Sequence, residues 1–326
     1  MRTRPLSIAA LLIAAAGLTA CGAPAGSLDG CTPTLPTGAA AGQVTVEQGD
    51  AAPSVEFQIP LVSEGDQVAH QGGEGERVSQ GQVVDADYVV YSGKTGDLIT
   101  SSYPTPGSEA PAAEPLRLAA GGETALSQAV ACAAPGSSVV LTTTVEALFG
   151  PSATSPEMDI TPADTAVVVL EVSDVHPGRA EGNARPGQQG MPAVTLATDG
   201  TPGVTFPGSP APEELTVMQS IEGTGEPVAE GDNVLVHYTG IVWETQEVFD
   251  SSWERGAPTP MTIDDASLIP GFVDAVVGQP IGSQVVVSIP QELGYNDPAT
   301  RPESIGEGEH LLFVIDILDR LEPAAG

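Results

Sequence analysis

Residues 236–252, VHYTGIVWETQEVFDSS, bring aromatic, acidic and hydroxyl side chains together within one short stretch. Only 4% of the residues in the chain are aromatic, so each ring at such a place carries more information than usual. Phe249 and Asp250 set a ring directly beside a carboxylate, the mixture of apolar surface and one polar group that binding pockets use. The stretch therefore indicates the beginning of a binding pocket.

The same stretch occurs 150 positions earlier in a version that lacks this ring and this carboxylate. Residues 86–102 read ADYVVYSGKTGDLITSS, and Ile99 and Thr100 stand where the later copy has Phe249 and Asp250. The residues typical of strands and turns are kept, whereas the ring and the carboxylate that could contact a ligand are replaced. This contrast predicts different roles for the two halves of the chain.

Metal chemistry is not expected from this sequence. Cys31 and Cys132 lie in no CxxC or Cys/His spacing, and the acidic residues show no EF-hand spacing. The four histidines are scattered, and we expect them to be structural or exposed: His70, His176, His237 and His310. For the two cysteines we prefer a disulfide that clamps the N-terminal segment to the first domain. Two unpaired thiols are the alternative, and spacing alone does not decide between them.

The elements that would position the pocket recur in the same order in both halves. Residues 73–102 align with 223–252 without a gap, and ten of the thirty pairs are identical. Further matching segments are 136–150 with 282–296 and 165–175 with 310–320. Two copies of one fold are the simplest account of a repeat of this length and order.

Each copy combines strand patterns with one short helix. Runs rich in Val, Ile, Thr and Tyr are separated by Gly, Pro and Asp clusters, which is typical of an antiparallel sheet. The helix of the second copy is IPGFVDAVVG, with Pro270 in its first turn and Gly278 at its C-terminal cap. The first copy has ALSQAVACAAPG at the matching place. We therefore predict the α+β class, with two domains that each pack a curled antiparallel sheet on one short helix.

The first 20 residues read as a targeting segment. MRTR supplies positive charge, and the apolar stretch that follows ends in small residues and Cys21, which resembles a bacterial lipoprotein signal. An ordinary secretory signal with a chance cysteine is the alternative. We expect an extracytoplasmic protein that a lipid on Cys21 anchors to the bacterial cell membrane. The expected domains are a signal peptide (1–20), a lipidated cysteine and flexible tether (21–42), a first domain (43–177), a linker (178–190) and a second domain (191–323).

The charge of the chain excludes two classes of partner. Only 10 Lys and Arg stand against 43 Asp and Glu, and the formal net charge is -33. Phosphate binding needs clustered cations, so we expect no nucleic acid, and no polybasic contact with a membrane beyond the lipid anchor. The acidity itself is best read as a source of solubility.

Over residues 220–322 the chain resembles the FKBP-type peptidyl-prolyl isomerases. The motifs that carry the resemblance are VHYTG, VFDSS, RGAP, LIPGF, IGSQVVVSIP, ELGY and LLFVIDIL, in that order and spacing. The resemblance implies a half-wrapped sheet on a short helix, with a pocket between them that isomerises X–Pro bonds of proline-containing polypeptides. It implies no nucleophile, metal or cofactor, and it allows macrolide inhibitors to bind.

The resemblance also implies which residues form this pocket. The expected catalytic residues are Asp250, Tyr295 and Phe249, and the expected substrate-binding residues are Tyr238, Arg255, Leu268, Ile269, Phe272, Ile305 and Phe313. Arg255 is placed to pair with Asp250, and Ile269 offers a backbone N–H to a ligand carbonyl. The chain departs from the family at Thr259, where an aromatic is usual, and in the acidic last loop. Taken singly, Tyr238, Phe249, Phe272 and Phe313 are each better explained as ordinary core residues, and their joint occurrence in the order of the family favours the pocket.

The first copy lacks most of these pocket residues. Its counterparts of Phe249, Asp250, Phe272, Tyr295 and Phe313 are Ile99, Thr100, Leu126, Phe149 and Val168, while Tyr88 matches Tyr238. We expect a degenerate copy that has lost catalysis and binds chains, braces the second domain or acts as a spacer. For the whole protein we expect an isomerase that assists the folding of exported proteins. The alternative is a non-catalytic chaperone or interaction lipoprotein.

Overall fold

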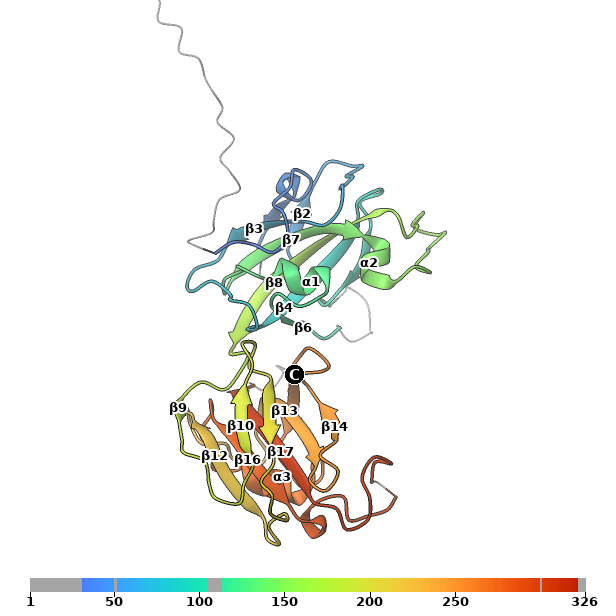
Figure 1. The fold of residues 1–326 in the computed structure, drawn as a ribbon. Coiled ribbons are helices and arrows are strands. Elements are labelled where there is room, and N and C mark those ends of the chain that lie inside the picture. Colours follow the sequence, from blue (N-terminus) through green and yellow to red (C-terminus); the bar gives the residue numbers. More distant parts are fainter. Residues whose placement is uncertain (1–30, 50–51, 105–112, 300, 322–326) are drawn as a thin grey trace, which may run out of the picture.

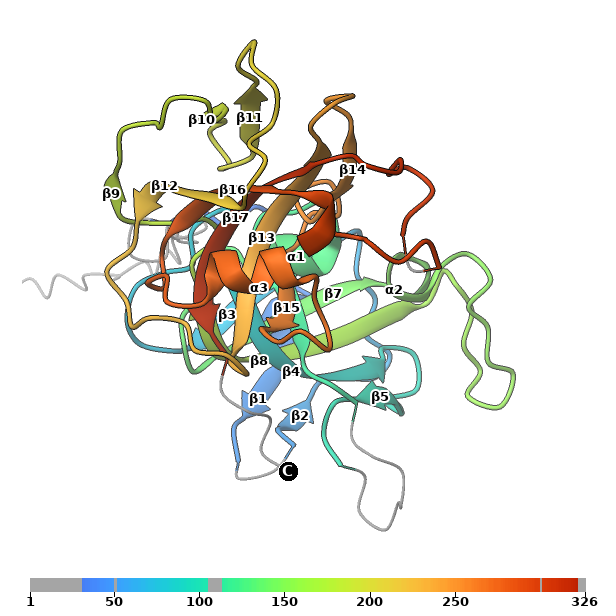
Figure 2. The same cartoon turned by 90° about the horizontal axis from the view of Figure 1, so that it is seen from below.

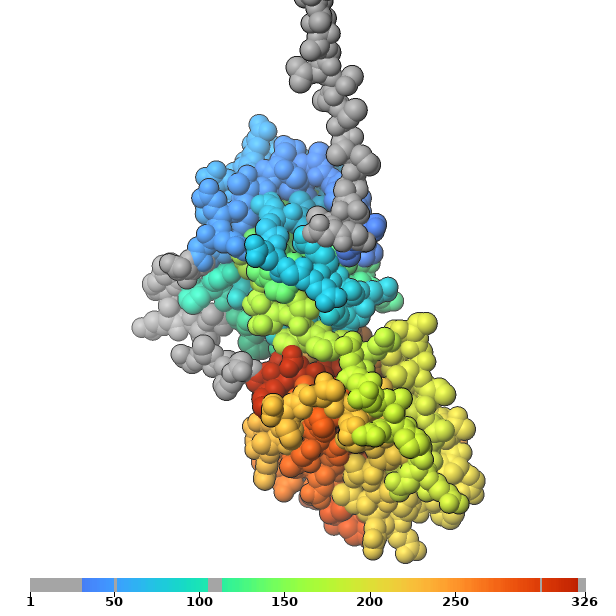
Figure 3. Space-filling view, turned by 90° about the vertical axis from the view of Figure 1, so that its left-hand side faces the viewer, coloured from blue at the N-terminus to red at the C-terminus, as the bar shows by residue number. Residues whose placement is uncertain are grey.

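Two antiparallel sheets, one in each half of the chain, form the framework of the computed structural model (Figure 1). The structure describes residues 31–49, 52–104, 113–299 and 301–321. In Figure 3 the N-terminal half, blue to green, and the C-terminal half, yellow to red, are stacked end to end. The expected signal peptide and Cys21 lie outside the described residues.

In the N-terminal half the strand order is β3-β7-β8-β4-β5, and β6 also pairs with β4. The strands are β3 (Gln67–Gly72), β4 (Val83–Ser92), β5 (Leu98–Ser101), β6 (Leu116–Ala119), β7 (Ser137–Thr144) and β8 (Thr165–His176). A separate hairpin-like pair consists of β1 (Thr45–Glu47) and β2 (Ser54–Glu56).

The sheet of the C-terminal half has the order β12-β16-β17-β13-β14, with β9 added beyond β12 and β15 paired with β13. The strands are β9 (Asn183–Ala184), β12 (Thr216–Glu222), β13 (Asn233–Val242), β14 (Val248–Ser251), β15 (Thr259–Thr262), β16 (Gln284–Ile289) and β17 (Leu311–Arg320). A separate pair consists of β10 (Ala193–Leu196) and β11 (Pro202–Thr205). Apart from β9, the strand order is the same in both halves.

The register of the two sheets matches residue by residue as well. Val90 lies opposite Thr100 in the N-terminal sheet, and Gly240 lies opposite Asp250 in the C-terminal sheet, with an offset of 150 on both strands. The central strands β4 and β13 each carry a bulge at the same place in their pairing with the last long strand. The sequence repeat is thus accompanied by one strand order and one register.

Three short helices accompany the sheets in the described part of the chain. They are α1 (Ala125–Ala129) and α2 (Val145–Phe149) in the N-terminal half and α3 (Pro270–Val276) in the C-terminal half, with 3-10 turns at η1 (Ala41–Gln43) and η2 (Gln291–Leu293). Figure 2 shows α3 lying across the sheet, where its face of Phe272, Val273 and Val276 joins the core. The predicted α+β class, with an antiparallel sheet packed on a short helix in each half, is confirmed.

Residues 31–42 differ from the flexible tether that the sequence predicts. A disulfide joins Cys31 to Cys132, whose Cα atoms are 5.6 Å apart. Leu35 is buried in the core, and the N–H of Val68 donates to the carbonyl of Pro36 at 3.0 Å. The small, Pro-containing composition led to the tether expectation, but the disulfide and these contacts hold the segment on the first sheet. No helix among the described residues is long and apolar enough to cross a membrane.

The segment expected as a linker, 178–190, is bound to the C-terminal half. Its N–H of Ala180 donates to buried Asp316 at 2.8 Å, and β9 adds two residues to the edge of the C-terminal sheet. Just before it, His176 Nδ1 lies 2.9 Å from Asp319 of the C-terminal half and Nε2 lies 3.5 Å from Asp85 of the N-terminal half. The two halves are therefore joined by hydrogen bonds and charges as well as by the chain.

Candidate functional site

A cavity of about 470 Å³ opens in the C-terminal half between the sheet, α3 and the segment that precedes α3. Its lining consists of Tyr238, Phe249, Asp250, Met261, Asp265, Ala266, Ser267, Leu268, Ile269, Pro270, Phe272, Tyr295 and Phe313. The chain folds this way locally because Pro270 occupies the first turn of α3 while Ile269, still extended, ends the preceding loop. The end of the helix and the face of the sheet thereby enclose one mostly apolar space.

Aromatic rings form the inner wall of this cavity. Phe313 packs edge-to-face against Phe272 and against Phe249, with ring centroids 5.5 Å apart in both pairs. Tyr295 meets Phe249 edge-on at 6.4 Å. Phe272 and Phe313 are 3% and 4% exposed, so they are both core residues and floor of the cavity. Edge-to-face packing fixes each ring through its neighbour, which gives the cavity a defined shape.

Gly240 makes room for these rings. A Cβ built at this position would lie 2.5 Å from Cζ of Phe249 and 2.9 Å from Cε1 of Phe313, closer than real Cβ atoms come. In the matching register of the N-terminal sheet stands Val90. The sequence did not single out Gly240. Its role depends on the two rings that cross the strand there, and a glycine within a strand only hints at such a close approach.

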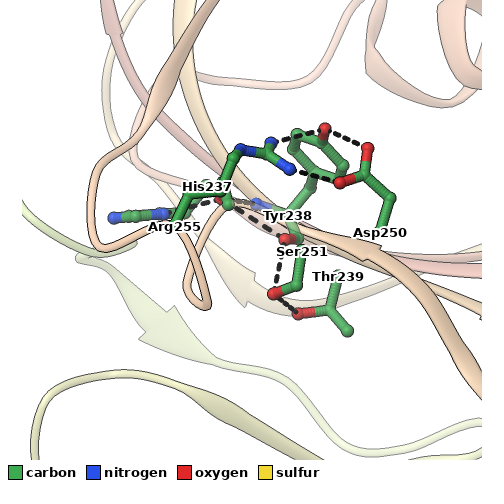
Figure 4. Close-up of polar contacts among 7 residues, drawn as sticks. His237, Tyr238, Thr239, Asp250, Ser251 and Arg255 are labelled. Carbon is green, nitrogen blue, oxygen red and sulfur yellow. Dashed lines mark hydrogen bonds and ion pairs between the residues drawn. The ribbon is translucent and has the colours of Figure 1, made fainter.

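Three polar side chains meet at the mouth of the cavity (Figure 4). The Tyr238 hydroxyl donates to Asp250 Oδ2 at 2.5 Å, and Arg255 Nη2 donates to the Tyr238 oxygen at 2.7 Å. Arg255 also forms the expected ion pair with Asp250, and its guanidinium lies over the Tyr238 ring at 5.4 Å. Burial, together with the bond to Asp250, raises the pKa of Tyr238 to about 12. The phenol therefore stays protonated and the carboxylate stays oriented.

Behind the mouth, buried groups hold β13 and β14 in place. Ser252 Oγ accepts the backbone N–H of Tyr238 at 2.8 Å and lies 2.8 Å from Nδ1 of His237. The His237 ring stacks on Trp253 with centroids 3.8 Å apart. Burial and the charge of Arg255 lower the pKa of His237 to about 4, so this ring is neutral at pH 7. The prediction that His237 is structural agrees with this position.

Among the hydrogen-bond donors of the cavity lining, the backbone N–H of Ile269 and the hydroxyl of Tyr295 have no partner within the described part of the protein. Burial, with a contribution from the charge of Asp250, raises the pKa of Tyr295, so this hydroxyl also keeps its hydrogen. Both donors are available to a carbonyl oxygen of a bound ligand.

Eight of the ten expected pocket residues line the cavity, and the other two do not. Arg255 acts on the lining through Asp250 and Tyr238. Ile305 is 6% exposed and belongs to the same core cluster as Phe272 and Phe313, but it is not among the residues that line the cavity. Thr259, expected to lower one wall, lies in β15, and Met261 of the same strand lines the cavity. Met261 could not be predicted as a lining residue, because the sheet face that a strand residue occupies is known only once its partner strand is known.

A second, smaller cavity lies in the N-terminal half. It has a volume of about 230 Å³ and is lined by Tyr88, Val90, Thr100, Leu116, Leu126, Leu148, Phe149 and Val168. These lining residues include every predicted counterpart of a C-terminal pocket residue except Ile99. Among the described residues no charged side chain lines it, in contrast to Asp250 in the other half. The described residues contain no group of three or more His, Cys, Asp or Glu that could hold a metal ion.

The chain was compared with known proteins. The sequence pattern of the family described as FKBP-type peptidyl-prolyl cis-trans isomerase matches residues 224–318. A FK506-binding protein of Streptomyces anulatus is 36% identical over 117 residues, 36% of this chain and 94% of the relative. A probable FK506-binding protein of Corynebacterium glutamicum is 36% identical over 120 residues, which cover 36% of this chain and 96% of the relative. The crystal structure of FkpA from Escherichia coli is 26% identical with a TM-score of 0.30, and the match covers 41% of this chain and about half, 52%, of that one.

Proposed function

Because the chain belongs to the FKBP-type peptidyl-prolyl cis-trans isomerases and is therefore a prolyl isomerase, we propose that the C-terminal cavity performs this reaction on exported proteins. The observation that carries this proposal is the coincidence of three features in one open cavity. They are a wall of packed rings, an unpartnered backbone N–H at Ile269, and the oriented carboxylate of Asp250 at the mouth.

The reaction needs a place where the X–Pro amide loses its planarity at lower cost than in water. Resonance holds the bond planar with a rotation barrier of about 18–20 kcal/mol, and uncatalysed exchange takes about 10–100 s. The twisted amide is less dipolar than the planar one, so removal of water favours it. The rings of Phe249, Phe272 and Phe313 provide such a dry surface for the prolyl ring.

Polar groups of the cavity then favour the twisted state over the planar one. The N–H of Ile269 binds the carbonyl on one side of the proline and fixes the chain while the preceding carbonyl turns. Asp250, held by Tyr238 and Arg255, presents its charge to the rotating amide without transferring a proton. Tyr295 donates at the rim. An acceleration of ten thousandfold requires about 5.4 kcal/mol of differential stabilisation, and net hydrogen bonds of about 0.5–1.5 kcal/mol each supply a part of it.

The N-terminal half fits a degenerate copy of the same domain that does not isomerise. Its shared strand order and register support common descent. Its described lining lacks the carboxylate of Asp250 and has no ring at the positions of Phe249, Phe272 and Phe313. Thr100 stands at the register position of Asp250, and a threonine hydroxyl supplies no fixed negative charge. We therefore assign catalysis to the C-terminal half.

The proposal places the protein outside the cytoplasm, anchored by a lipid on Cys21. It rests on the signal-like residues 1–20 and on the small residues before Cys21. The disulfide between Cys31 and Cys132 supports an oxidising compartment. Metabolic labelling with a fatty acid should label the wild type and not the Cys21→Ser variant. Labelling of both, or of neither, would contradict the anchor while leaving the assignment of catalysis unaffected.

The proposed site also predicts inhibition by a macrolide. The relatives are named for binding FK506, and the cavity of about 470 Å³ lies within the range of about 300–1,000 Å³ typical of small-molecule sites. Titration of the full chain with FK506 should abolish isomerisation of a prolyl tetrapeptide with a stoichiometry of one per chain. A chain that isomerises the peptide at full rate under saturating FK506 would place the reaction outside this cavity.

A further inference from the structure

We propose that the cavity of the N-terminal half binds one apolar side chain of an unfolded polypeptide, without requiring proline. The identification of a polypeptide as the occupant rests on the proposed function, because the matching cavity of the other half takes a polypeptide. The shape and chemistry of the site rest on the N-terminal residues alone.

The position of the cavity is that of the C-terminal one. Val90 and Thr100 face one another across β4 and β5 as Gly240 and Asp250 do across β13 and β14. Matching backbone hydrogen bonds hold the segment that follows the helix in each half. The N–H of Cys132 donates to the carbonyl of Val78, and the N–H of Gly278 donates to the carbonyl of Val228. Both donors have positive φ, 67° and 83°. The space between sheet and helix is therefore formed in the same way in both halves.

The size of the cavity excludes the larger ligands. Val90 carries an isopropyl group at the register position where Gly240 has no side chain. Val168 stands at the register position of Phe313. The resulting volume is about 230 Å³, against about 470 Å³ in the other half. This volume falls below the range of about 300–1,000 Å³ for drug-sized ligands. A macrolide does not fit, whereas one aliphatic or aromatic side chain does.

The polarity of the cavity favours an apolar occupant. Leu116, Leu126 and Leu148 line it with two valines, and the polar side chains among its described lining residues are Thr100 and Tyr88. Phe149 lies at the end of α2, lines the cavity and remains 47% exposed. The helix α2 is capped by the Thr144 side chain, which accepts the N–H of Ala147 at 3.2 Å, so the ring is presented from an ordered element. A bound side chain would cover this exposed ring.

The consequence for the whole chain is two polypeptide sites of unequal chemistry. The N-terminal site holds a client by any suitable apolar residue, and the C-terminal site acts on its prolines. Linking two weak sites raises the local concentration of the second ligand group once the first is bound. Long unfolded clients should therefore be isomerised more efficiently than tetrapeptides, which reach only one site.

Methyl NMR of the full chain tests the inference directly. The probe is a proline-free peptide rich in Leu and Phe, added after FK506 has filled the C-terminal cavity. We expect chemical-shift changes at the methyl groups of Leu126, Leu148 and Val168. Phe149→Ala should weaken binding roughly tenfold, as loss of a ring at the centre of a contact commonly does. The matched control is Leu98→Ala, which removes another exposed apolar side chain (43% exposed) outside the cavity.

Three outcomes decide the matter. Shifts in the N-terminal cavity that Phe149→Ala weakens and Leu98→Ala leaves unchanged support the inference. Absent shifts, or equal weakening by both variants, overturn it. Isomerisation of a prolyl tetrapeptide should be unchanged in Phe149→Ala, and its absence in the wild type would overturn the proposed catalytic site instead. The two failures are therefore distinguishable.

Discussion

The Tyr238 hydroxyl lies 2.5 Å from Asp250 Oδ2, so two residues of neighbouring strands act as one polar unit at the mouth of the cavity. Arg255 completes the unit from the following loop by contacting both. The side chains of Asp250 and Arg255 are 41% and 48% exposed. An ion pair this exposed adds little to stability. We therefore attribute its value to orientation of the carboxylate.

Loss of either member of this unit should reduce catalysis more than stability. Tyr238→Phe and Asp250→Asn should each lower kcat/KM roughly ten- to a hundredfold, because a hydrogen bond to a charged group contributes about 1.5–3 kcal/mol. The double variant should lose less than the product of the two, with a coupling of about 0.5–3 kcal/mol. Steady-state kinetics on a prolyl tetrapeptide measures this cycle. Strictly additive losses would show that the two residues act independently.

Gly240→Val should disrupt the aromatic wall. The new side chain would overlap Phe249 and Phe313, and overpacking of this kind costs about 1–3 kcal/mol of stability. We expect a lower melting temperature and reduced FK506 affinity. The matched change Val90→Gly in the N-terminal half creates space and should leave FK506 affinity unchanged. Full affinity of Gly240→Val would mean that the rings are not confined as the structure describes.

Reduction of the disulfide should destabilise the N-terminal half selectively. Cys31 and Cys132 are 101 positions apart, and closure of a loop of this length stabilises a fold by about 4–5 kcal/mol in the chain-entropy description. Dithiothreitol should lower the melting temperature of the N-terminal half and leave tetrapeptide isomerisation by the C-terminal half unchanged at 25 °C. The Cys31→Ser/Cys132→Ser variant, insensitive to dithiothreitol, is the control. A reductant effect of equal size in that variant would contradict the assignment.

The contact between the halves should weaken in alkaline solution. Although burial alone would lower it, ion pairing with Asp319 and Asp85 raises the pKa of His176 to about 9. Asp85 itself is held at a pKa of about 2 by His176 and Arg117, which outweigh its burial, so it stays charged. The stabilisation that His176 supplies is therefore complete below its ordinary pKa of about 6.5 and is lost as the pH rises through about 9.

The matched variant for this pH effect is His176→Gln. The difference in melting temperature between wild type and variant should be largest near pH 6 and small near pH 10. Comparison of the two chains at each pH cancels the growing repulsion of the other acidic groups. A difference that stays constant from pH 6 to pH 10 would show that the charge of His176 is not what joins the halves.

Much of this architecture could be predicted because the sequence contains an internal repeat. The gap-free match of 73–102 with 223–252 fixed the strands, and the structure gives both halves one strand order. The helix at 270–276 followed from Pro270, Gly278 and the apolar spacing. What could not be predicted depends on contacts across the sheet. The tight approach of Gly240 to two rings and the placement of Met261 on the cavity side require the register, which local sequence does not state.

Two other expectations failed for related reasons. Small and Pro-containing residues made 31–42 read as a tether, although Cys31 and Leu35 hold this segment on the first sheet. Ile305 was assigned to the pocket by resemblance alone, and in this chain it lies in the core beside the cavity without lining it. In both cases long-range contacts decided the structure, and composition or position in a motif did not reveal them.

The account depends most on catalysis by the C-terminal cavity alone, and one paired kinetic measurement tests it. Isomerisation of a prolyl tetrapeptide is measured for the full chain and for two variants at the same register position, Asp250→Val and Thr100→Val. We predict that Asp250→Val lowers kcat/KM at least tenfold, about 1.4 kcal/mol in transition-state stabilisation, and that Thr100→Val leaves it unchanged. Full activity of Asp250→Val, or an equal loss in Thr100→Val, would contradict the account.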